Sequence, residues 1–382
     1  MDEDPRGDEP SAGRRPVAGI VGAGTMGAGI AQVALEAGWA VQVHDPAPGA
    51  AARGLERISD GLRRRAARRR VTGDAVGPFV DDHLRRLEVV PDLGAVATGA
   101  DIVVEAALED LETKRGIFAE LDRAAAARTI LATNTSALSV TAIASAAARH
   151  PERVVGLHFF NPAPVLLLVE VVAGERTAPA AVDRATAIVT DWGKTAVRSA
   201  DSPGFIVNRV NRPFTIEPLR LLEAGEATVP EIDAAVRAGG FAMGPFELMD
   251  LVGLDVNLAA ATAIWEGLGR PERLRPSPIQ DRLVRDGRLG RKAGVGFYDY
   301  RAGGDPVVAP IPTDLAPLPR DRRLRPTAIV DRIRRAIGAE AVLARDEGVA
   351  SEADIDSALW LGAAHPQGPF AWACGHDPTI AP

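Results

Sequence analysis

One histidine and one glutamate bracket an apolar segment of the sequence, HFFNPAPVLLLVE, residues 158–170. The proline-marked corner predicts that residues 161–165 turn the chain into an antiparallel hairpin, whose second strand consists of the Leu and Val residues that follow. His158 and Glu170 lie equally far from the midpoint of this hairpin, near Pro164. They would face each other with Cβ atoms roughly 5 Å apart. The carboxylate would orient the imidazole and stabilise its protonated form, as a general base requires. The alternative is a structural ion pair at a sheet edge.

A glycine-rich turn near the N-terminus has the spacing of a dinucleotide site. GAGTMG places Gly22, Gly24 and Gly27 in the order GxGxxG, with Thr25 and Met26 between the last two. The first glycine permits a tight turn, the second lets the backbone approach a pyrophosphate, and the third lets helix and strand pack closely. The following helix offers free N–H groups to phosphates. We expect these five residues at a cofactor; the alternative is a turn without a ligand.

An acidic residue, Asp45, closes the second strand of the same βαβ unit. Its carboxylate would accept hydrogen bonds from the adenosine ribose and repel a 2′-phosphate, so NAD is favoured over NADP. An alcohol that loses hydride must also lose its hydroxyl proton, and His158 could accept that proton. The nucleotide motif therefore favours the catalytic interpretation of the histidine.

Two further segments follow expected strands. IVVEAALEDLETK carries Glu109 and Lys114, and TNTSAL carries Asn134 and Ser136. The carboxyl ends of parallel strands face the ligand crevice, so these side chains are candidates for ligand contact. The alternatives are a solvated helix start for the first pair and a helix cap for the second.

The elements that must position these residues alternate between strand and helix, which predicts an α/β Rossmann-type domain with a doubly wound sheet. The expected strands are residues 17–21, 41–44, 87–90, 102–104, 129–133 and 154–157, and expected helices include residues 112–126 and 140–148. The first helix should end near Ala37, with Gly38 as its cap.

Helical periodicity dominates after about Asp201, so we expect a Rossmann domain over residues 16–200 and an all-α domain over residues 201–300. Residues 1–15 predict a disordered tail, and the six prolines of residues 301–326 predict a linker. Residues 329–356 (IVDRIRRAIGAEAVLARDEGVASEADID) then repeat residues 206–233 (IVNRVNRPFTIEPLRLLEAGEATVPEID) without a gap. Residues 327–382 are therefore expected to be a second, shortened helical copy.

The composition argues against several classes of function. The formal net charge of −7 argues against nucleic acid as the main partner. No apolar run approaches the ~20 residues of a membrane span, and no residues have convincing metal-ligand spacing. The single cysteine, Cys374, excludes an intrachain disulfide and suggests a reducing cytoplasm.

The motifs together resemble the 3-hydroxyacyl-CoA dehydrogenases of fatty-acid β-oxidation and related acyl-CoA pathways. The resemblance covers about residues 17–300 and rests on GAGTMGAGIA, VVEAALED, NTSAL, HFFNPAPV, VEVV, DSPGFIVNR, GPFELMDLVGLD and GRKAGVGFYDY, in this order. It implies NAD-dependent oxidation of a (3S)-3-hydroxyacyl-CoA to a 3-oxoacyl-CoA, or the reverse. It also implies that His158 is the base and Glu170 its partner.

Further roles are implied by the resemblance alone. Ser136 and Asn208 would hold the 3-oxygen of the substrate. The cofactor site would be lined by Glu109, Lys114 and Asn134. Single-copy members dimerise through the helical domain, so the second copy is expected to replace the partner and give a monomer, or a homodimer if it covers that face only in part.

Two departures concern the acyl-CoA substrate. Leu166-Leu167 stands where the family often has Met-Lys, and Gly61 lies near the place of a family Ser that contacts coenzyme A. The basic run LRRRAARRR, residues 62–70, could still supply cations for the phosphates, unless it is a solvated helix face. Two rival functions are a dehydrogenase of a free hydroxy acid, such as gulonate dehydrogenase, and a non-catalytic NAD-binding protein.

Overall fold

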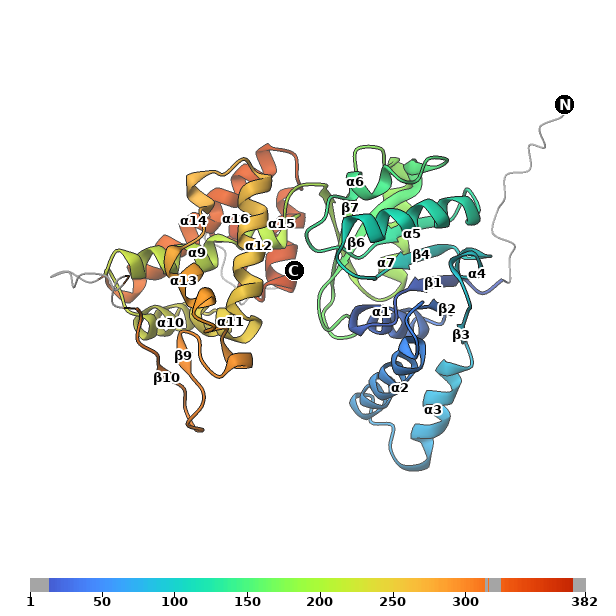
Figure 1. Ribbon diagram of the computed structural model, residues 1–382, viewed down its shortest axis with the longest axis horizontal. Helices are drawn as coiled ribbons and strands as arrows, with labels where there is room; N and C mark the ends of the chain where they lie inside the picture. Colours follow the sequence, from blue (N-terminus) through green and yellow to red (C-terminus); the bar gives the residue numbers. More distant parts are fainter. Residues whose placement is uncertain (1–13, 313–314, 316–323, 374–382) are drawn as a thin grey trace. The chain divides into compact units, whose positions relative to one another are not determined.

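The computed structural model describes residues 14–312, 315 and 324–373, so most of the expected tail lies outside the described residues. The chain divides into two compact units (Figure 1). Unit 1 holds residues up to Thr135, Val140–Val169 and Ala173–Thr195; unit 2 holds Ser136–Ser139, Glu170–Val172 and the chain from Ala196 onward. The division at Ala196 lies close to the boundary expected at Asp201. The segments around Ser136 and Glu170, however, belong to unit 2.

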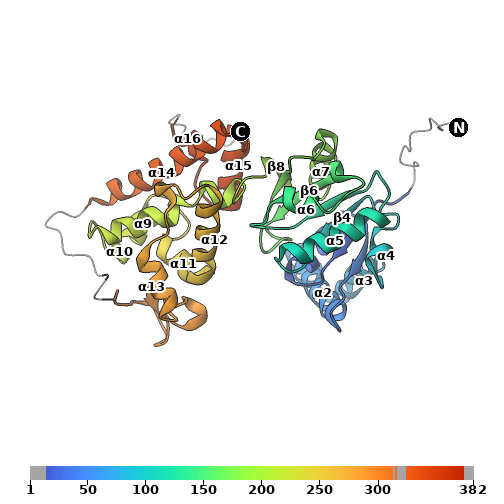
Figure 2. The ribbon, with the colours of Figure 1, turned by 45° about the horizontal axis from the view of Figure 1, so that its top comes forward.

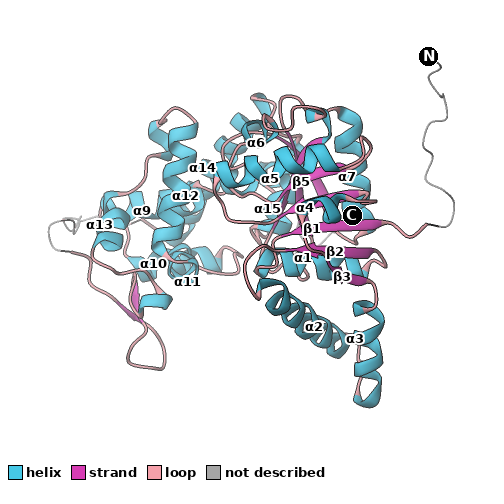
Figure 3. Ribbon diagram, turned by 45° about the vertical axis from the view of Figure 1, so that its right-hand side comes forward, coloured by secondary structure: helices cyan, strands magenta, loops and turns pink. Residues whose placement is uncertain are grey.

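The main sheet has eight strands in the order β3-β2-β1-β4-β5-β6-β7-β8, several of which are visible in Figure 3. The strands are β1 (Val17–Val21), β2 (Ala40–His44), β3 (Leu87–Val89), β4 (Ile102–Glu105), β5 (Ile130–Thr133), β6 (Val154–Phe159), β7 (Leu168–Ala173) and β8 (Thr195–Ala200). The first six pair in parallel. Val21 is in register with His44 and Glu105, and Glu105 with Thr133, so these strands end at one edge. This edge holds the glycine turn, Asp45 and Asn134.

Seven helices of unit 1 connect or cover these strands. They are α1 (Thr25–Glu36), α2 (Ala50–Arg68), α3 (Val76–Leu84), α4 (Leu93–Ala97), α5 (Leu111–Ala124), α6 (Val140–Ala144) and α7 (Pro179–Asp191). The predicted Rossmann-type fold is confirmed, and Gly38 takes a φ of +90° as it ends the first helix. The helix expected over residues 140–148 is shorter, because it stops at Ala144.

The connection between β6 and β7 is longer than the predicted turn. The second strand was expected to include Leu166, but it begins at Leu168. The reason lies in the backbone carbonyls of this loop: the Lys194 ammonium donates to those of Ala163 (2.6 Å) and Leu166 (2.9 Å). Burial lowers the pKa of Lys194 to about 8. The N–H groups of Val165 and Leu166 also donate to the Pro162 carbonyl, so this segment is held as a loop and not as a strand.

Unit 2 is mainly helical. Its first helices are α8 (Val207–Val210), α9 (Pro213–Glu223), α10 (Val229–Ala238), α11 (Pro245–Val252), α12 (Leu254–Gly267) and α13 (Pro278–Arg285), and the last three are α14 (Pro326–Asp346), α15 (Glu352–Gly362) and α16 (Pro369–Ala373). Part of the predicted linker is instead a strand, because β10 (Val307–Val308) pairs antiparallel with β9 (Tyr298–Asp299). Residues 313–314 and 316–323 of that linker lie outside the described residues.

The sequence repeat is also a structural repeat. Asp233 accepts hydrogen bonds from the backbone N–H groups of Phe246 and Glu247 at the start of α11. Asp356 does the same for Phe370 and Ala371 in α16. A Cβ atom on the preceding glycine, Gly244 or Gly368, would collide with the aspartate in either copy. Both copies therefore use the same aspartate cap and the same glycine.

The two copies differ where the first contains a proline. The first copy is broken into α8 and α9, and α9 begins at Pro213. The aligned position in the second copy is Ala336, and there α14 runs unbroken from Pro326 to Asp346. Proline removes a backbone N–H donor and clashes with the preceding turn, which explains the break.

A reciprocal pair of ion contacts joins the two copies within unit 2. The Arg209 guanidinium contacts the Glu340 carboxylate at 2.9 Å, and the Arg332 guanidinium contacts Glu217 at 3.0 Å. Arg209 aligns with Arg332 in the repeat, and Glu217 with Glu340. Figure 2 shows α9 and α14 side by side. An exchange of equivalent contacts is the mark of a two-fold interface between like surfaces.

No single described helix is long and apolar enough to cross a membrane. The helices α11 and α12 together pass a test of length and composition, but they are bent by 101° at their junction.

Candidate active site

The glycine turn fits a pyrophosphate. Gly22 has a φ of +97°, and a Cβ there would lie 2.6 Å from the Ala106 carbonyl oxygen. A Cβ on Gly27 would lie 1.9 Å from the Gly22 carbonyl oxygen. At Gly24, by contrast, a Cβ would meet no atom within 4 Å, and Gly24 and Thr25 are exposed. The middle glycine thus leaves open space at the N-terminus of α1, where a phosphate can approach the backbone.

Asp45 follows β2 directly and lies beside this turn. One carboxylate oxygen accepts from the Ala23 N–H at 2.8 Å, and the other accepts from the Ala47 N–H at 3.0 Å. These bonds fix the carboxylate against the turn. A carboxylate offers about four acceptor positions, so it retains capacity for ribose hydroxyls.

Glu109 and Lys114 come together through a residue that the sequence did not single out. Lys114 is fully buried, and its ammonium lies 2.7 Å from the Glu105 carboxylate and 3.4 Å from Glu109. Glu109 is partly exposed and also accepts a hydrogen bond from the Thr135 hydroxyl at 2.6 Å. Glu109 is therefore placed to meet a ligand. Lys114 is buried and holds Glu109 in place through their ion contact. Direct contact between Lys114 and a cofactor stays a prediction.

Glu105 belongs to this network, although the sequence motifs did not predict it as a site residue. It is fully buried and accepts hydrogen bonds from the Ala107 N–H and the Thr133 hydroxyl as well as from Lys114. Its signal in the sequence is an acidic side chain that ends a buried strand, IVVE. Such a carboxylate needs a cation, and Lys114 is that cation.

His158 lies at the end of β6, beside Asn134. The Asn134 side-chain oxygen accepts from the Phe159 N–H at 3.0 Å, so it ties the end of β5 to the end of β6. The His158 ring is largely buried and packs on Phe160, with centroids 4.4 Å apart. Glu170 is fully buried in β7, the strand next to β6 in the sheet. Direct contact between His158 and Glu170 stays a prediction.

Glu170 has a second task within unit 2. Its carboxylate accepts hydrogen bonds from the backbone N–H groups of Ile206 (3.0 Å) and Val207 (2.8 Å). These groups open the short helix α8, which carries Asn208. The Asn208 amide donates to the Ser136 carbonyl oxygen at 3.4 Å. Glu170 therefore helps to hold the two residues assigned to the substrate oxygen side by side.

A small cavity lies at Ser136 and Asn208, entirely within unit 2. It has a volume of about 60 Å³ and is lined by Ser136, Ala137, Pro203, Gly204, Asn208, Ala260, Ala263 and Ile264. Its polar groups belong to Ser136 and Asn208, the two residues predicted to hold the 3-oxygen of the substrate. Three apolar side chains come from α12, a helix that no sequence motif predicts to lie at the site.

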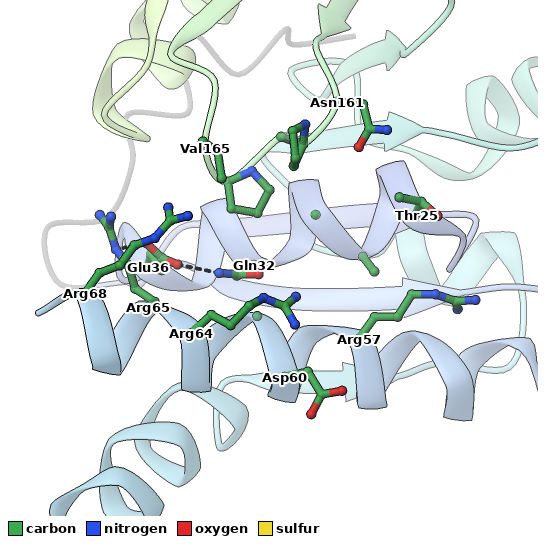
Figure 4. A pocket seen from close by; sticks show the side chains of 16 residues that line it. Thr25, Gln32, Glu36, Arg57, Asp60, Arg64, Arg65, Arg68, Asn161 and Val165 are labelled. Atoms are coloured by element: carbon green, nitrogen blue, oxygen red, sulfur yellow. Dashed lines mark hydrogen bonds and ion pairs between the residues drawn. The ribbon is translucent and has the colours of Figure 1, made fainter. Parts of the chain in front are cut away.

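A larger cavity, of about 440 Å³, lies within unit 1 between α1, α2 and the loop after β6. Four arginines line it: Arg57, Arg64, Arg65 and Arg68. Figure 4 shows that Arg57 and Arg64 reach into the space between α1 and α2, while Asp60 points away. Arg63 does not line the cavity but contacts Asp60 at 3.1 Å, with its side chain 59% exposed. The predicted basic run is thus divided between a cavity wall and a solvated face.

Gln32 occupies the space beside Gly61. A Cβ on Gly61 would lie 1.9 Å from the Gln32 side-chain oxygen, so any larger residue at position 61 would have to displace the Gln32 amide. The Gln32 amide donates to Glu36 at 2.7 Å, and Glu36 in turn contacts Arg65 at 2.8 Å. The hydroxyl expected near position 61 from the resemblance is therefore replaced by an amide that reaches the same cavity from α1.

Known proteins resemble this chain over most of its length. Residues 17–202 match the NAD binding domain of 3-hydroxyacyl-CoA dehydrogenase, and residues 204–300 and 329–376 both match its C-terminal domain. The chain belongs to the 3-hydroxyacyl-CoA dehydrogenase family. Within this family, two matches to one C-terminal domain confirm that the helical domain is duplicated.

Relatives in this family match either almost the full chain or about three quarters of it. The 3-hydroxyadipyl-CoA dehydrogenase of Escherichia coli is 38% identical, over 92% of this chain and 89% of its own length. The 3-hydroxybutyryl-CoA dehydrogenase of Mycobacterium tuberculosis is 42% identical, over 74% of this chain and 97% of its own. The crystal structure of 3-hydroxybutyryl-CoA dehydrogenase from E. coli superposes with a TM-score of 0.83 at 36% identity, over 94% of this chain and 91% of that one. The predicted family, fold and NAD cofactor are confirmed.

The described residues contain no group of three or more histidine, cysteine, aspartate or glutamate side chains that could hold a metal ion. The roles of the individual site residues in this dehydrogenase are not assigned by the comparisons and stay predictions, which the geometry supports to different degrees.

Proposed function

We propose that this chain oxidises a (3S)-3-hydroxyacyl-CoA at C3 to the 3-oxoacyl-CoA, or catalyses the reverse reaction. Removal of the hydride from C3 is the chemistry that NAD supplies when it is bound. The observation that carries the proposal is that Glu170 holds the α8 N–H groups while Asn208 bonds to Ser136. This arrangement supports Ser136 and Asn208 as donors to an oxygen at C3.

His158 is the proposed base. The hydroxyl proton of the substrate moves to an imidazole nitrogen as the carbonyl forms, and the imidazole returns that proton in the reverse direction. Ser136 and Asn208 donate to the developing carbonyl oxygen, and such donors act best when the fold fixes them before reaction. The hydrogen bond that the Phe159 N–H donates to the Asn134 side-chain oxygen holds the end of the strand that carries His158.

The arginine-lined cavity is the proposed site for the phosphates of coenzyme A. Guanidinium groups match phosphate oxygens in geometry and charge, and the three phosphate groups of coenzyme A need several cations. Glu36 and Asp60 also line the cavity, but Asp60 points away from the arginines (Figure 4). The cavity therefore presents more positive than negative charge to a ligand.

The second helical copy is proposed to make the chain a pseudo-dimer. The reciprocal contacts of Arg209 with Glu340 and of Arg332 with Glu217 support a monomer in which the second copy fills the place of a partner. A homodimer is the alternative outcome of a mass measurement. The proposed location is the cytoplasm, on the basis of the single Cys374.

A turnover assay separates this proposal from its rivals. The purified chain should oxidise NADH with acetoacetyl-CoA and not with free acetoacetate. Activity on the free acid would favour a hydroxy-acid dehydrogenase, and no activity on either, with NADH still bound, would favour a non-catalytic protein. A His158→Gln variant should keep NADH affinity and lose turnover by roughly 10²-fold or more. Near-normal turnover in this variant would rule out His158 as the base.

A further inference from the structure

The small cavity at Ser136 and Asn208 has one polar end and one apolar end. The apolar end is formed by Ala260, Ala263 and Ile264. These residues are spaced by three and four along α12, so they lie on one face of that helix. A substrate whose 3-oxygen meets the polar end would therefore direct its acyl tail toward α12.

One wall of the apolar end is a rigid side chain. Ile264 is 4% exposed and belongs to a core cluster with Ile216 and Leu274. On its other side it packs on the backbone of Gly204, where a Cβ would lie only 2.7 Å from its Cδ1 atom. Ile264 therefore has neighbours on both sides and cannot retreat from a longer tail without disturbing the core.

The size and charge of the cavity limit the ligand. A volume of about 60 Å³ holds about four water-sized groups, at roughly 15 Å³ each. None of the described residues that line it carries a charge, so a carboxylate at the tail end would find no cation there.

We infer that α12 restricts this dehydrogenase to short, uncharged 3-hydroxyacyl groups of about four to six carbons, with Ala263 and Ile264 as the residues that set the limit. This inference rests on the proposed function, because it takes Ser136 and Asn208 as the ligands of the 3-oxygen. Among the relatives above, it matches the substrate in the name of the 3-hydroxybutyryl-CoA dehydrogenases. A 3-hydroxyadipyl group, which appears in the name of a relative from E. coli, ends in a carboxylate and does not fit.

The test is a profile of kcat/KM over 3-hydroxyacyl-CoA substrates of four, six and ten carbons, together with 3-hydroxyadipyl-CoA. The four-carbon substrate should exceed the ten-carbon substrate by tenfold or more. The uncharged six-carbon substrate should exceed the adipyl substrate by a similar factor. Equal values across the four substrates, or a preference for the long or the charged one, would overturn the inference.

Two variants test whether Ala263 and Ile264 set the limit on acyl-chain length. Ala263→Val adds volume at an exposed position and should lower kcat/KM for six carbons at least threefold more than for four. Ile264→Ala should raise kcat/KM for ten carbons relative to four. The control is Ala259→Val, which lies on α12 at an exposed position outside the cavity and should leave the profile unchanged.

Different outcomes test the length limit and the proposed function separately. If Ile264→Ala does not fold, the Ala263→Val profile decides alone, and an equal loss at four and six carbons would refute the inference. Turnover of acyl-CoA substrates regardless of length would overturn the inference and leave the proposed function standing. No turnover of any of the four substrates, with NAD bound, would overturn the proposed function and the inference with it.

Discussion

The carboxylate of Glu170 accepts a hydrogen bond from the backbone N–H of Val207 at 2.8 Å, one residue before Asn208. Glu170 is fully buried, so the loss of this acceptor would leave buried N–H groups without a partner. The glutamate therefore links the strand next to His158 with the helix that carries Asn208. This relationship gives Glu170 a function that is separate from any contact with the histidine.

Two substitutions at Glu170 should separate these functions. Glu170→Gln keeps an oxygen that can accept from Val207 but removes the charge, so we expect kcat to fall about tenfold or more with the fold intact. Glu170→Ala removes the acceptor as well, and kcat should fall further. If Glu170 positions Asn208, adding Asn208→Ala to Glu170→Ala should cost less than it costs in the parent chain. Additive losses would show that the two residues act independently.

Asp45 should select between the two nicotinamide cofactors. Its carboxylate is fixed beside the glycine turn by bonds from Ala23 and Ala47. Asp45→Ala removes a ribose acceptor together with a charge that repels a 2′-phosphate, so the KM for NAD should rise more than the KM for NADP. We expect the preference for NAD to fall by at least tenfold. Equal changes in both constants would show that Asp45 does not lie at the ribose.

Neighbouring arginines on α2 allow a matched test of the proposed coenzyme A site. Arg64 lines the larger cavity, whereas Arg63 is exposed and contacts Asp60. Arg64→Ala should raise the KM for acetoacetyl-CoA by roughly tenfold, the loss of one charge-assisted contact, and leave the KM for NADH unchanged. Arg63→Ala is the control and should change neither constant. Equal effects of both changes would indicate general attraction by a basic surface instead of a site.

The parts of this site that the sequence predicted are those that depend on neighbouring residues in the chain. The turn at Gly22, its helix and Asp45 form one continuous βαβ unit, so the pattern of residue types was sufficient. Glu105, Lys194 and Gln32 were missed, because each acts through a partner brought close only by folding. For Lys194 those partners are backbone carbonyls, which leave no trace in residue type.

Contacts that form only on folding also explain why β7 begins later than the apolar run predicts. An apolar run predicts a strand wherever its backbone is free to pair. The carbonyl of Leu166 is instead taken by Lys194, which is distant in sequence, and the strand begins two residues later, at Leu168. Asn208 could be assigned only by resemblance, because its position depends on Glu170.

A buried histidine should make unit 2 sensitive to acid. His365 is 3% exposed, and its Nε2 lies 2.8 Å from the Asn211 side-chain oxygen. Burial, and then the nearby charge of Arg334, lower the pKa of His365 from 6.5 to about 3. The unfolded chain gains a proton below pH 6.5 and the folded chain does not, so the free energy of unfolding should fall as the pH falls through this window.

The expected size is about 1.4 kcal/mol per pH unit, or about 2 kcal/mol between pH 6.5 and 5. His365→Gln cannot take up this proton, so its urea-unfolding free energy should decline less over the same range by about that amount. Each protein's value at pH 7.5 serves as its own reference. Parallel pH profiles for the two proteins would contradict the assignment.

The last prediction concerns the interface between the two helical copies. Arg209 is fully buried, and its ionic partners among the described residues, Glu340 and Glu347, both belong to the second copy. A chain cut after Tyr300 would leave this guanidinium without them and would expose the apolar face of α9 that α14 covers. Because Glu217 aligns with Glu340, two truncated chains could restore the contact by pairing Arg209 of each with Glu217 of the other.

We therefore expect the truncated chain to dimerise or aggregate in light scattering, while the full chain does not. Glu217→Ala in the truncated chain should weaken that dimer, since it removes the partner of Arg209 across the new two-fold axis. In the full chain the same change leaves Arg209 paired with Glu340 and should not alter the mass. A truncated chain that remained a soluble, fully active monomer would refute the view that the second copy replaces a partner subunit.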